Sequence, residues 1–416
     1  MSIACPSSPS RRLLYQFLRL PVQLRTFAIS RGHQQERSKI AEAVQQENLR
    51  NEEEVKKKKD DKMDYSGPKK EKKPIAVPRP SASVLLISPQ NQILLLQRVK
   101  QSSSFPSAHV FPGGNVSEFH DGRVPEPEHP DRHVDGDAYR MAAIRETFEE
   151  SGILLARNNG FGRLIEVPQA EREAGRVAVH SSEISFPKWL AQKGGRADVQ
   201  GLTPFTRWVT PTNNPKRFTT QMYLYFLPTL ASTPLREGSG EPDDSEAEVD
   251  IPAPTTDGGK EHTTARFLPA SVWCRLAQEG RIILFPPQFF LLHQIAQHFD
   301  DLKSPTDYAS ISRAPLPREQ LEARRRRLLE FVKTGSPPWT DMCISPVTRP
   351  SRDGKLKGPD GRQVLSLHHP GVEVEKQGTG RAGLTEQVVL VDFQKEGPRR
   401  LNVISRDEAI QRVGKL

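Results

Sequence analysis

The stretch "AAIRETFEESG", Ala142–Gly152, places three glutamates within a turn and a half of a predicted helix. They are Glu146, Glu149 and Glu150. Like charges spaced i, i+4 repel each other by roughly a few tenths of a kcal/mol per pair. A surface helix tolerates this repulsion for solubility, and a metal-binding helix tolerates it because a cation neutralises the charge. Carboxylate oxygens are the hard ligands that Mg²⁺ and Mn²⁺ prefer, so these glutamates are candidate metal ligands.

The residues around the glutamates predict a helix from about Ala138 to Glu150 with two distinct faces. Each residue turns the helix by about 100°, so Met141, Ile144 and Phe148 share one apolar face. The glutamates fall on the opposite side together with the two alanines of the quoted stretch. Gly152 is expected to end the helix. We therefore expect one face buried in the core and one open acidic face.

The chain on both sides of this helix predicts an α/β fold. Apolar runs at Val84–Ile87 and Ile93–Leu96 flank a Ser-Pro-Gln-Asn-Gln turn, which indicates a β-hairpin with buried strands. Residues 203–228 predict two more strands joined by a turn rich in Pro and Asn. Residues 265–280 and 284–299 are expected to be helical.

The C-terminal part of the chain predicts a short helix followed by strands. Arg324–Arg327 lie on the helix, where a solvated face is the expected role of the charges. Residues 363–376 and 385–395 contain apolar runs typical of strands. We expect a small β element at this end of the chain.

Composition limits the possible classes of protein. The 416 residues contain 35% hydrophobic residues and 36 prolines, which indicates one globular core with disordered segments around it. The net charge of +9 is spread along the chain, and no pattern of interleaved basic and aromatic residues is present, so nucleic acid is not an expected partner. Cys5, Cys274 and Cys343 show no CxxC spacing, which fits a reducing compartment. No apolar run approaches the ~18 residues of a membrane span.

The N-terminal residues 1–34 resemble a mitochondrial transit peptide. They contain arginines but no acid before Glu36, and Leu13, Leu14, Phe17 and Leu18 have helical spacing. A disordered basic tail is the alternative interpretation. The chain ends in Gly-Lys-Leu, close to a peroxisomal signal. A mitochondrial matrix location is therefore the expectation, and the peroxisome is the weaker alternative.

The segment "FPGG" followed by "RETFEESG" resembles the signature of the Nudix hydrolases, called the Nudix box. That pattern is a Gly, an acid six residues later, and then Arg-Glu-apolar-x-Glu-Glu-x-Gly-apolar. Its second half is matched at Arg145, Glu146, Glu149, Glu150, Gly152 and Ile153, with Thr147 at a usually apolar position. The resemblance implies a phosphoanhydride hydrolase with a mixed sheet sandwiched between helices.

The box departs from the family pattern by an insertion. Gly114 and Arg145 are 31 positions apart, where the family has 14, so 31 − 14 = 17 residues are added. The polar loop at 115–137 contains His120, His129 and His133, which are expected to be solvated rather than to bind metal. Asp137 stands eight residues before the Arg, where the family has its isolated glutamate, and Asp135 or Asp137 is a candidate helix cap.

A split box of this kind resembles that of the animal and fungal acyl-CoA diphosphatases. The segments "LLLQRVKQSSSFPSAHVFPGG", "TPFTRWVTPTNNPKRFTTQMYLYFL" and "ILFPPQFFLL" also resemble this branch. The resemblance implies hydrolysis of CoA or acyl-CoA to 3′,5′-ADP and (acyl-)phosphopantetheine, with Mg²⁺ or Mn²⁺ as cofactor. A Nudix hydrolase of a dinucleotide, nucleotide sugar or capped RNA, and a non-catalytic Nudix-fold interaction protein, are the alternatives.

The resemblance also assigns roles to residues. Glu146 and Glu150, at i and i+4, would be the principal metal ligands, and Glu149 would complete the coordination or orient the attacking water. Arg145 would hold a neighbouring carboxylate in place. Gly113 and Gly114 are candidates for close approach to metal or phosphate. Candidates for binding the 3′-phosphate are Arg98, Lys100, Lys216 and Arg217. Candidates for contact with the adenine or acyl group are Phe105, Phe111 and Trp208, and core packing is the default role of these three.

These patterns divide the chain into parts. We expect a transit peptide at 1–34, a charged linker at 35–77, the Nudix domain at 78–300 with a disordered insertion at 234–264, and a C-terminal extension at 301–416.

Overall fold

The computed structural model describes the chain from residue 74 onward, with gaps. The described residues are 74–99, 107–158, 161–228, 254–255, 262–302, 304, 306–308, 316–348, 350–351, 354–355, 357–358 and 360–413. The predicted transit peptide, most of the linker, Lys100, Phe105 and nearly all of the insertion predicted at 234–264 lie outside them. Within the described ranges no helix is long and apolar enough to cross a membrane.

The predicted hairpin lies in the middle of a mixed eight-stranded sheet, and the two strands predicted at 203–228 lie beside it. The strand order is β10-β2-β1-β9-β8-β11, with β3 pairing to β2 and β4 to β1. Strand β1 runs antiparallel to β2 and parallel to β9. The strands are β1 (Arg79–Ile87), β2 (Ile93–Arg98), β3 (His109–Val110), β4 (Gly113–Asn115), β8 (Thr203–Val209), β9 (Phe218–Phe226), β10 (His262–Leu268) and β11 (Cys343–Ile344).

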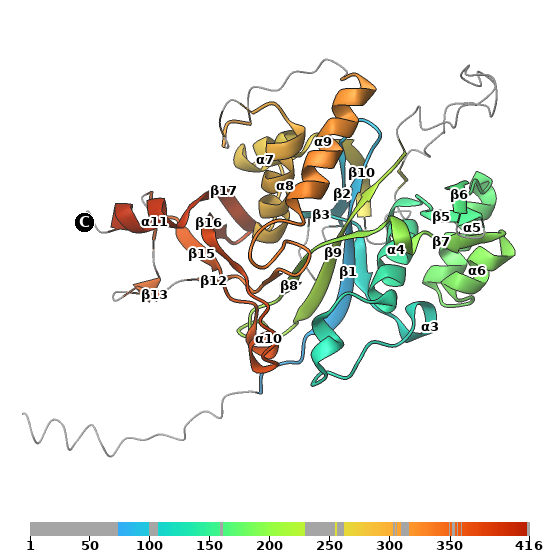
Figure 1. Ribbon diagram of the computed structural model, residues 1–416, viewed down its shortest axis with the longest axis horizontal. Helices are drawn as coiled ribbons and strands as arrows, with labels where there is room; N and C mark the ends of the chain where they lie inside the picture. The colour runs from blue at the N-terminus through green and yellow to red at the C-terminus, as the bar shows by residue number, and fades with distance from the viewer. Residues whose placement is uncertain are drawn as a thin grey trace, which may run out of the picture. The chain divides into compact units, whose positions relative to one another are not determined.

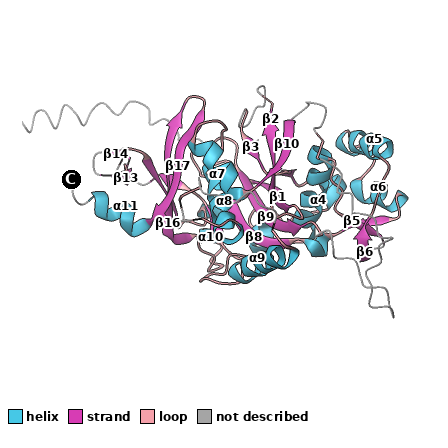
Figure 2. Cartoon of the chain, turned by 90° about the horizontal axis from the view of Figure 1, so that it is seen from above, coloured by secondary structure: helices cyan, strands magenta, loops and turns pink. Residues whose placement is uncertain are grey.

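Helices cover both faces of this sheet, as the predicted α/β/α sandwich requires (Figures 1 and 2). Alternate residues of a strand point to opposite faces, so β1 contributes to two cores. Val84 and Leu86 pack on the side of α4, and Leu85 and Ile87 pack on the side of α7 and α8. The covering helices are α4 (Asp137–Ser151), α7 (Ala270–Gln278), α8 (Pro286–Phe299) and α9 (Arg318–Phe331).

Helix α4 carries the stretch quoted at the outset, and its predicted extent is confirmed. Gly152 ends it in the left-handed conformation with φ of 74°, where a residue without a side chain is favoured. Its N-cap is Gly136, which has no side chain to cap with, so the predicted capping by Asp135 or Asp137 is wrong. Ile144 and Phe148 are fully buried, as predicted.

The acidic face predicted for α4 has a pocket over it but is otherwise enclosed. Ala142 and Ala143 are fully buried, and the side chain of Glu150 is 8% exposed. The helix is enclosed because β4 and helix α5 (Gln169–His180) pack against the side that the glutamates occupy. The three carboxylates therefore lie in a partly dehydrated environment.

The chain after α4 forms a small substructure that includes α5. It consists of the three-stranded sheet β6-β5-β7 and two helices. Phe186 and Trp189 of the second helix stack on Phe148, which attaches the substructure to α4. Its elements are β5 (Ala156–Asn158), β6 (Phe161–Leu164), α5 (Gln169–His180), α6 (Phe186–Gln192), β7 (Gly195–Ala197) and the 3₁₀ helix η3 (Val199–Gly201).

The polar loop between Gly114 and α4 has little regular structure, but several hydrogen bonds anchor it. It contains α3 (Glu118–Asp121) and the 3₁₀ helix η2 (Pro130–His133). His120 and His133 are buried rather than solvated, which corrects the prediction for these two residues. His133 exchanges a 2.9 Å hydrogen bond with Thr219 of β9, and Arg207 of β8 donates to the carbonyl of Val134.

The C-terminal strands are confirmed at 363–367 and 384–394 and form a second sheet, with order β12-β15-β16-β17, but residues 372–376 of the first predicted strand form a helix instead. Two predictions nearby are wrong. Residues 265–268 continue β10 rather than a helix. In α9, Arg324 is buried against Asp301, and Arg325 donates to the carbonyls of Ser88 and Leu227, so these two side chains fix the helix to the fold. The elements are β12 (Val347–Thr348), β13 (Pro350–Ser351), β14 (Gly354–Lys355), β15 (Gln363–Leu367), α10 (Val372–Lys376), β16 (Leu384–Gln394), β17 (Gly397–Ser405) and α11 (Arg406–Val413).

Candidate active site

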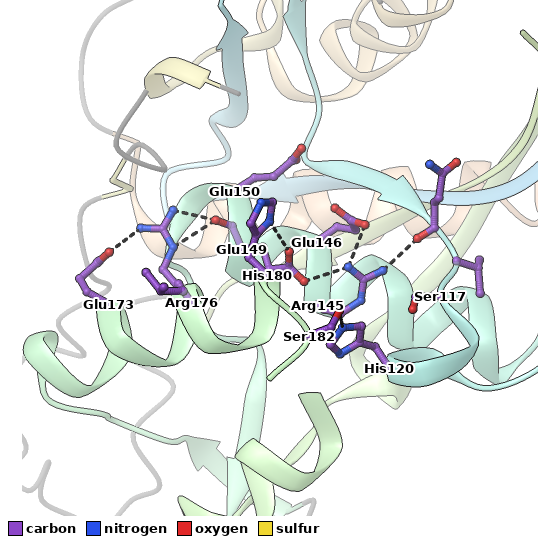
Figure 3. Close-up of a pocket in the computed structure, with 13 residues that line it drawn as sticks. Ser117, His120, Arg145, Glu146, Glu149, Glu150, Glu173, Arg176, His180 and Ser182 are labelled. Carbon is purple, nitrogen blue, oxygen red and sulfur yellow. Dashed lines mark hydrogen bonds and ion pairs between the residues drawn. The ribbon is translucent and has the colours of Figure 1, made fainter. Parts of the chain in front are cut away.

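A pocket of about 310 Å³ lies over the acidic side of α4 (Figure 3). The segment after β4 and helix α3 form one wall, α4 forms the floor, and α5 forms the opposite wall. Its lining residues are Asn115, Val116, Ser117, His120, Arg145, Glu146, Glu149, Glu150, Glu173, Arg176, Val177, His180 and Ser182. The pocket thus brings together the three glutamates predicted from sequence.

Arg145 occupies the centre of the acidic cluster, and its side chain is 5% exposed. Its Nη1 lies 2.9 Å from Oε1 of Glu146 and 2.9 Å from Oε1 of Glu149, and its Nη2 donates to the carbonyl of Asn115. Arg145 is therefore a positioning group for the carboxylates, the role that the family resemblance implied.

The acid that binds Arg145 most completely is Asp121, at the end of α3. Nε and Nη2 of Arg145 donate to its two carboxylate oxygens at 2.9 and 2.8 Å. Asp137, the residue at the family spacing, is exposed at the first turn of α4 and forms no ion pair with Arg145. The inserted loop lies between Asp121 and α4, so the pairing acid stands before the insertion and spacing alone pointed to the wrong residue.

Glu146 and Glu150 lie beside the glycine strand β4. The backbone N–H of Gly113 donates to Oε2 of Glu150 at 2.8 Å. A Cβ added to Gly114 would lie 2.5 Å from Cδ of Glu146, so only glycine lets the strand approach this carboxylate. Burial raises the pKa of Glu146 to about 7, and the neighbouring Arg145 offsets only part of this effect.

Glu149 faces helix α5 instead. Nδ1 of His180 lies 3.1 Å from Oε2 of Glu149. Nε and Nη2 of Arg176 donate to the backbone carbonyl of Glu149 at 3.1 and 2.8 Å, and Arg176 also binds Glu173 (Figure 3). The side chain and the main chain of Glu149 are therefore both fixed by one helix.

Sequence reasoning did not single out four residues near this site, namely Asp121, Arg176, His180 and His262. His262 of β10 is fully buried, with Nε2 at 3.7 Å from Oε1 of Glu150. The four approach α4 from three elements, which are α3, α5 and β10. Only Asp121 had a signal in the sequence, as an acid seven residues after Gly114.

The other predicted contact residues lie outside the pocket lining. Arg217 is buried and forms a two-pronged ion pair with Glu373 of α10, so it is not free to bind a phosphate. Trp208 and Phe111 belong to the core, their default role. Lys216 is exposed in a turn, and Arg98 pairs with His262 across β2 and β10.

The donor set fits a hard divalent cation. Glu146 carries a carboxylate whose charge burial disfavours, and a bound cation would relieve that cost. In the described part of the chain no group of three His, Cys, Asp or Glu residues is already gathered as metal ligands. Arg145 binds both Glu146 and Glu149 in this structure. Glu146 and Glu150, which share the β4 side, are the residues that would hold a cation.

The sequence of this region matches a known family. Residues 126–242, which contain α4 and α5, match the family described as the NUDT19 Nudix domain. The chain contains a Nudix domain. It is 30% identical over 184 residues to the acyl-coenzyme A diphosphatase NUDT19 of Gallus gallus, an alignment that covers 33% of this chain and 49% of the chicken protein.

A second relative of the Nudix domain is the acyl-coenzyme A diphosphatase NUDT19 of Xenopus laevis. It is 25% identical over 251 residues, which is 50% of this chain and 60% of the frog protein. The chain thus spans about half the length of the curated relatives that it matches. Among solved structures, a Nudix hydrolase from Alicyclobacillus acidocaldarius has a TM-score of 0.39 at 22% identity over 58% of this chain and 100% of its own, a score too low to support an argument.

Proposed function

We propose that this protein hydrolyses the phosphoanhydride bond of CoA or acyl-CoA, giving 3′,5′-ADP and (acyl-)phosphopantetheine, with Mg²⁺ or Mn²⁺. The observation that carries the proposal is the set of three dehydrated carboxylates on one helix, next to a glycine strand, in the region that matches the NUDT19 family. The names of the chicken and frog relatives supply the substrate class.

The residues have separate tasks in this proposal. Glu146 and Glu150 hold the divalent cation on the β4 side of α4. When bound, the cation supplies Lewis-acid neutralisation of charge on the phosphate oxygens. Gly113 and Gly114 let the backbone approach the anhydride closely. Arg145 donates through Nη1 to Glu149 and through Nε to Asp121, and so holds the carboxylates in place. Glu149, on the α5 side, orients the attacking water.

Recognition of the 3′-phosphate needs a fixed cation. Arg217 is held by Glu373 in a two-pronged ion pair, so it is not assigned this role. Arg98 is the proposed contact on its position alone, because it ends β2 next to His262, which lies beside Glu150. Arg98→Ala is expected to raise KM for CoA about tenfold and to leave hydrolysis of a substrate without the 3′-phosphate, dephospho-CoA, unchanged.

A panel of substrates tests the function. Purified protein with Mg²⁺ or Mn²⁺ is incubated with acyl-CoA, CoA, NADH and ADP-ribose, and the products are analysed by mass spectrometry. The proposal predicts 3′,5′-ADP from the first two and slower cleavage of the others. Cleavage of a dinucleotide with acyl-CoA intact would favour the alternative Nudix activity, and no turnover at all would favour a non-catalytic interaction protein.

The mitochondrial matrix is the proposed location, on the basis of the arginine-rich, acid-free residues 1–34. Fusing these residues to a fluorescent protein tests it. Mitochondrial import supports the proposal, and a signal in peroxisomes that depends on the last three residues of the full chain would replace it with the weaker alternative.

A further inference from the structure

Helix α5 approaches the acid-bearing helix from outside the Nudix box. Three consecutive turns of α5 present side chains to the pocket, namely Glu173, then Arg176 and Val177, then His180. Two of these, Arg176 and His180, bind a single residue of α4, Glu149. Arg176 holds the main-chain carbonyl of Glu149, and His180 contacts its carboxylate, so α5 fixes both parts of this one residue.

The environment of Glu149 differs from that of the other two glutamates. Glu146 and Glu150 lie against β4, within reach of each other at i and i+4. Glu149 has one oxygen bound to Arg145 and the other facing His180, and its main chain is held by Arg176. The side chain of Glu149 is 8% exposed and that of His180 is 47% exposed, so the His180 contact is made from the solvent-exposed side of a largely buried carboxylate.

We propose that His180 is a positioning residue: it holds the Glu149 carboxylate on the α5 side of the pocket, apart from the cation-binding pair Glu146 and Glu150. A carboxylate only accepts hydrogen bonds, so Nδ1 of His180 must carry the hydrogen that it shares with Oε2. This assignment rests on the proposed function, because it gives Glu149 the task of orienting water rather than binding metal.

The geometry explains why two bonds from α5 are needed. Arg145 binds Glu146 and Glu149 with the same Nη1, so a cation that draws Glu146 away would also disturb Glu149. His180 and Arg176 provide contacts to Glu149 that do not involve Arg145. The water-orienting carboxylate therefore keeps its place when the neighbouring charges rearrange.

The test uses the full-length protein and a matched control. His369 makes the same kind of contact elsewhere, with Nδ1 at 3.3 Å from Glu375 and a side chain 44% exposed against 47% for His180. His180→Leu is expected to lower kcat about tenfold with KM and Mn²⁺ affinity within about twofold of wild type, whereas His369→Leu leaves all three unchanged. His180→Asn, whose amide replaces the Nδ1 donor, is expected to restore most of kcat.

Two further measurements separate positioning from a structural effect. In a Glu149→Gln background, His180→Leu is expected to have no additional effect on kcat. Independently of any substrate, ¹⁵N-histidine NMR at a pH where the ring is neutral should show the Nδ1–H form of His180, lost in Glu149→Ala.

The proposal is overturned by any of four results. The first is a kcat for His180→Leu equal to that of the control, and the second is a fall in kcat from His180→Leu that is as large in the Glu149→Gln background as in the wild type. The third is a fall in the Mn²⁺ affinity of His180→Leu like that of Glu150→Gln. The fourth is an Nε2–H form of His180 in the wild type. If acyl-CoA is not cleaved but another substrate is, the kinetic arms use that substrate. If no substrate is cleaved, the NMR and Mn²⁺ arms still decide the role of His180.

Discussion

Asp121 and Arg145 form a buried, two-pronged ion pair although they stand 24 positions apart. The pair joins the glycine strand and α3 to the acid-bearing helix, and the inserted loop is accommodated between the two partners. The insertion can therefore vary without disturbing the carboxylates, because the contact that orders Arg145 is made before the loop begins.

Asp121→Asn is predicted to destabilise the protein by about 2 to 3 kcal/mol, because it leaves a buried guanidinium with one fewer compensating charge. Asp137→Asn is the control. Its side chain is exposed, so a change below about 1 kcal/mol is expected. Denaturant unfolding of both variants checks this, and equal effects would mean that Asp121 is not the structural partner of Arg145.

Glu150→Gln is predicted to lower turnover by at least about 100-fold with folding intact, since it removes a charge at nearly constant shape. Mn²⁺ should raise the melting temperature of the wild type and not that of this variant, because a ligand stabilises only the protein that binds it. Thermal unfolding with Mn²⁺ and with EDTA measures the difference. Near-normal turnover in the variant would remove Glu150 from the cation site.

Glu373→Gln is predicted to lower stability by about 2 to 3 kcal/mol without raising KM, because Arg217 serves the fold and not the substrate. The pair joins α10 to the turn before β9. Steady-state kinetics and urea unfolding of the variant test both parts. A raised KM for CoA with unchanged stability would return Arg217 to the substrate site.

Stability is predicted to fall as the pH drops from about 6.5 to 4. Burial lowers the pKa of His109, His133 and His293 to about 4, so they are neutral in the folded protein at pH 5. In the unfolded chain their pKa is about 6.5, so the unfolded state binds more protons in this window and is favoured by acid. At pH 5, protonation of each histidine in the unfolded chain lowers the free energy of unfolding by on the order of 2 kcal/mol. Urea unfolding at pH 7.5 and 5 tests this, and a flat profile contradicts it.

Local patterns predicted the elements of the fold and the chemistry of α4. Apolar runs bounded by turn residues located β1, β2, β8 and β9, and helical spacing located α4, because burial imposes these patterns on the sequence. The same reasoning misread residues 265–268, a short apolar run that fits a strand or a helix equally well. It also took Arg324 and Arg325 for solvent-facing charges, because burial of an arginine depends on distant partners.

The partners of the glutamates were not predictable from spacing. His180 stands 31 positions after Glu149, and Arg176 stands 27 positions after it. These contacts exist only because the substructure after α4 folds back over it. Local sequence patterns do not predict such long-range contacts. The family spacing would have located the acid that pairs with Arg145, but the insertion in the box changed that spacing.

A crystal structure grown with Mn²⁺ and CoA tests the central claim most directly. The account predicts anomalous density for Mn²⁺ within about 2.5 Å of carboxylate oxygens of both Glu146 and Glu150, with the anhydride phosphates against it and Glu149 still on His180. Carboxylates that remain paired with Arg145, with no anomalous density beside them and CoA intact in solution, would contradict it.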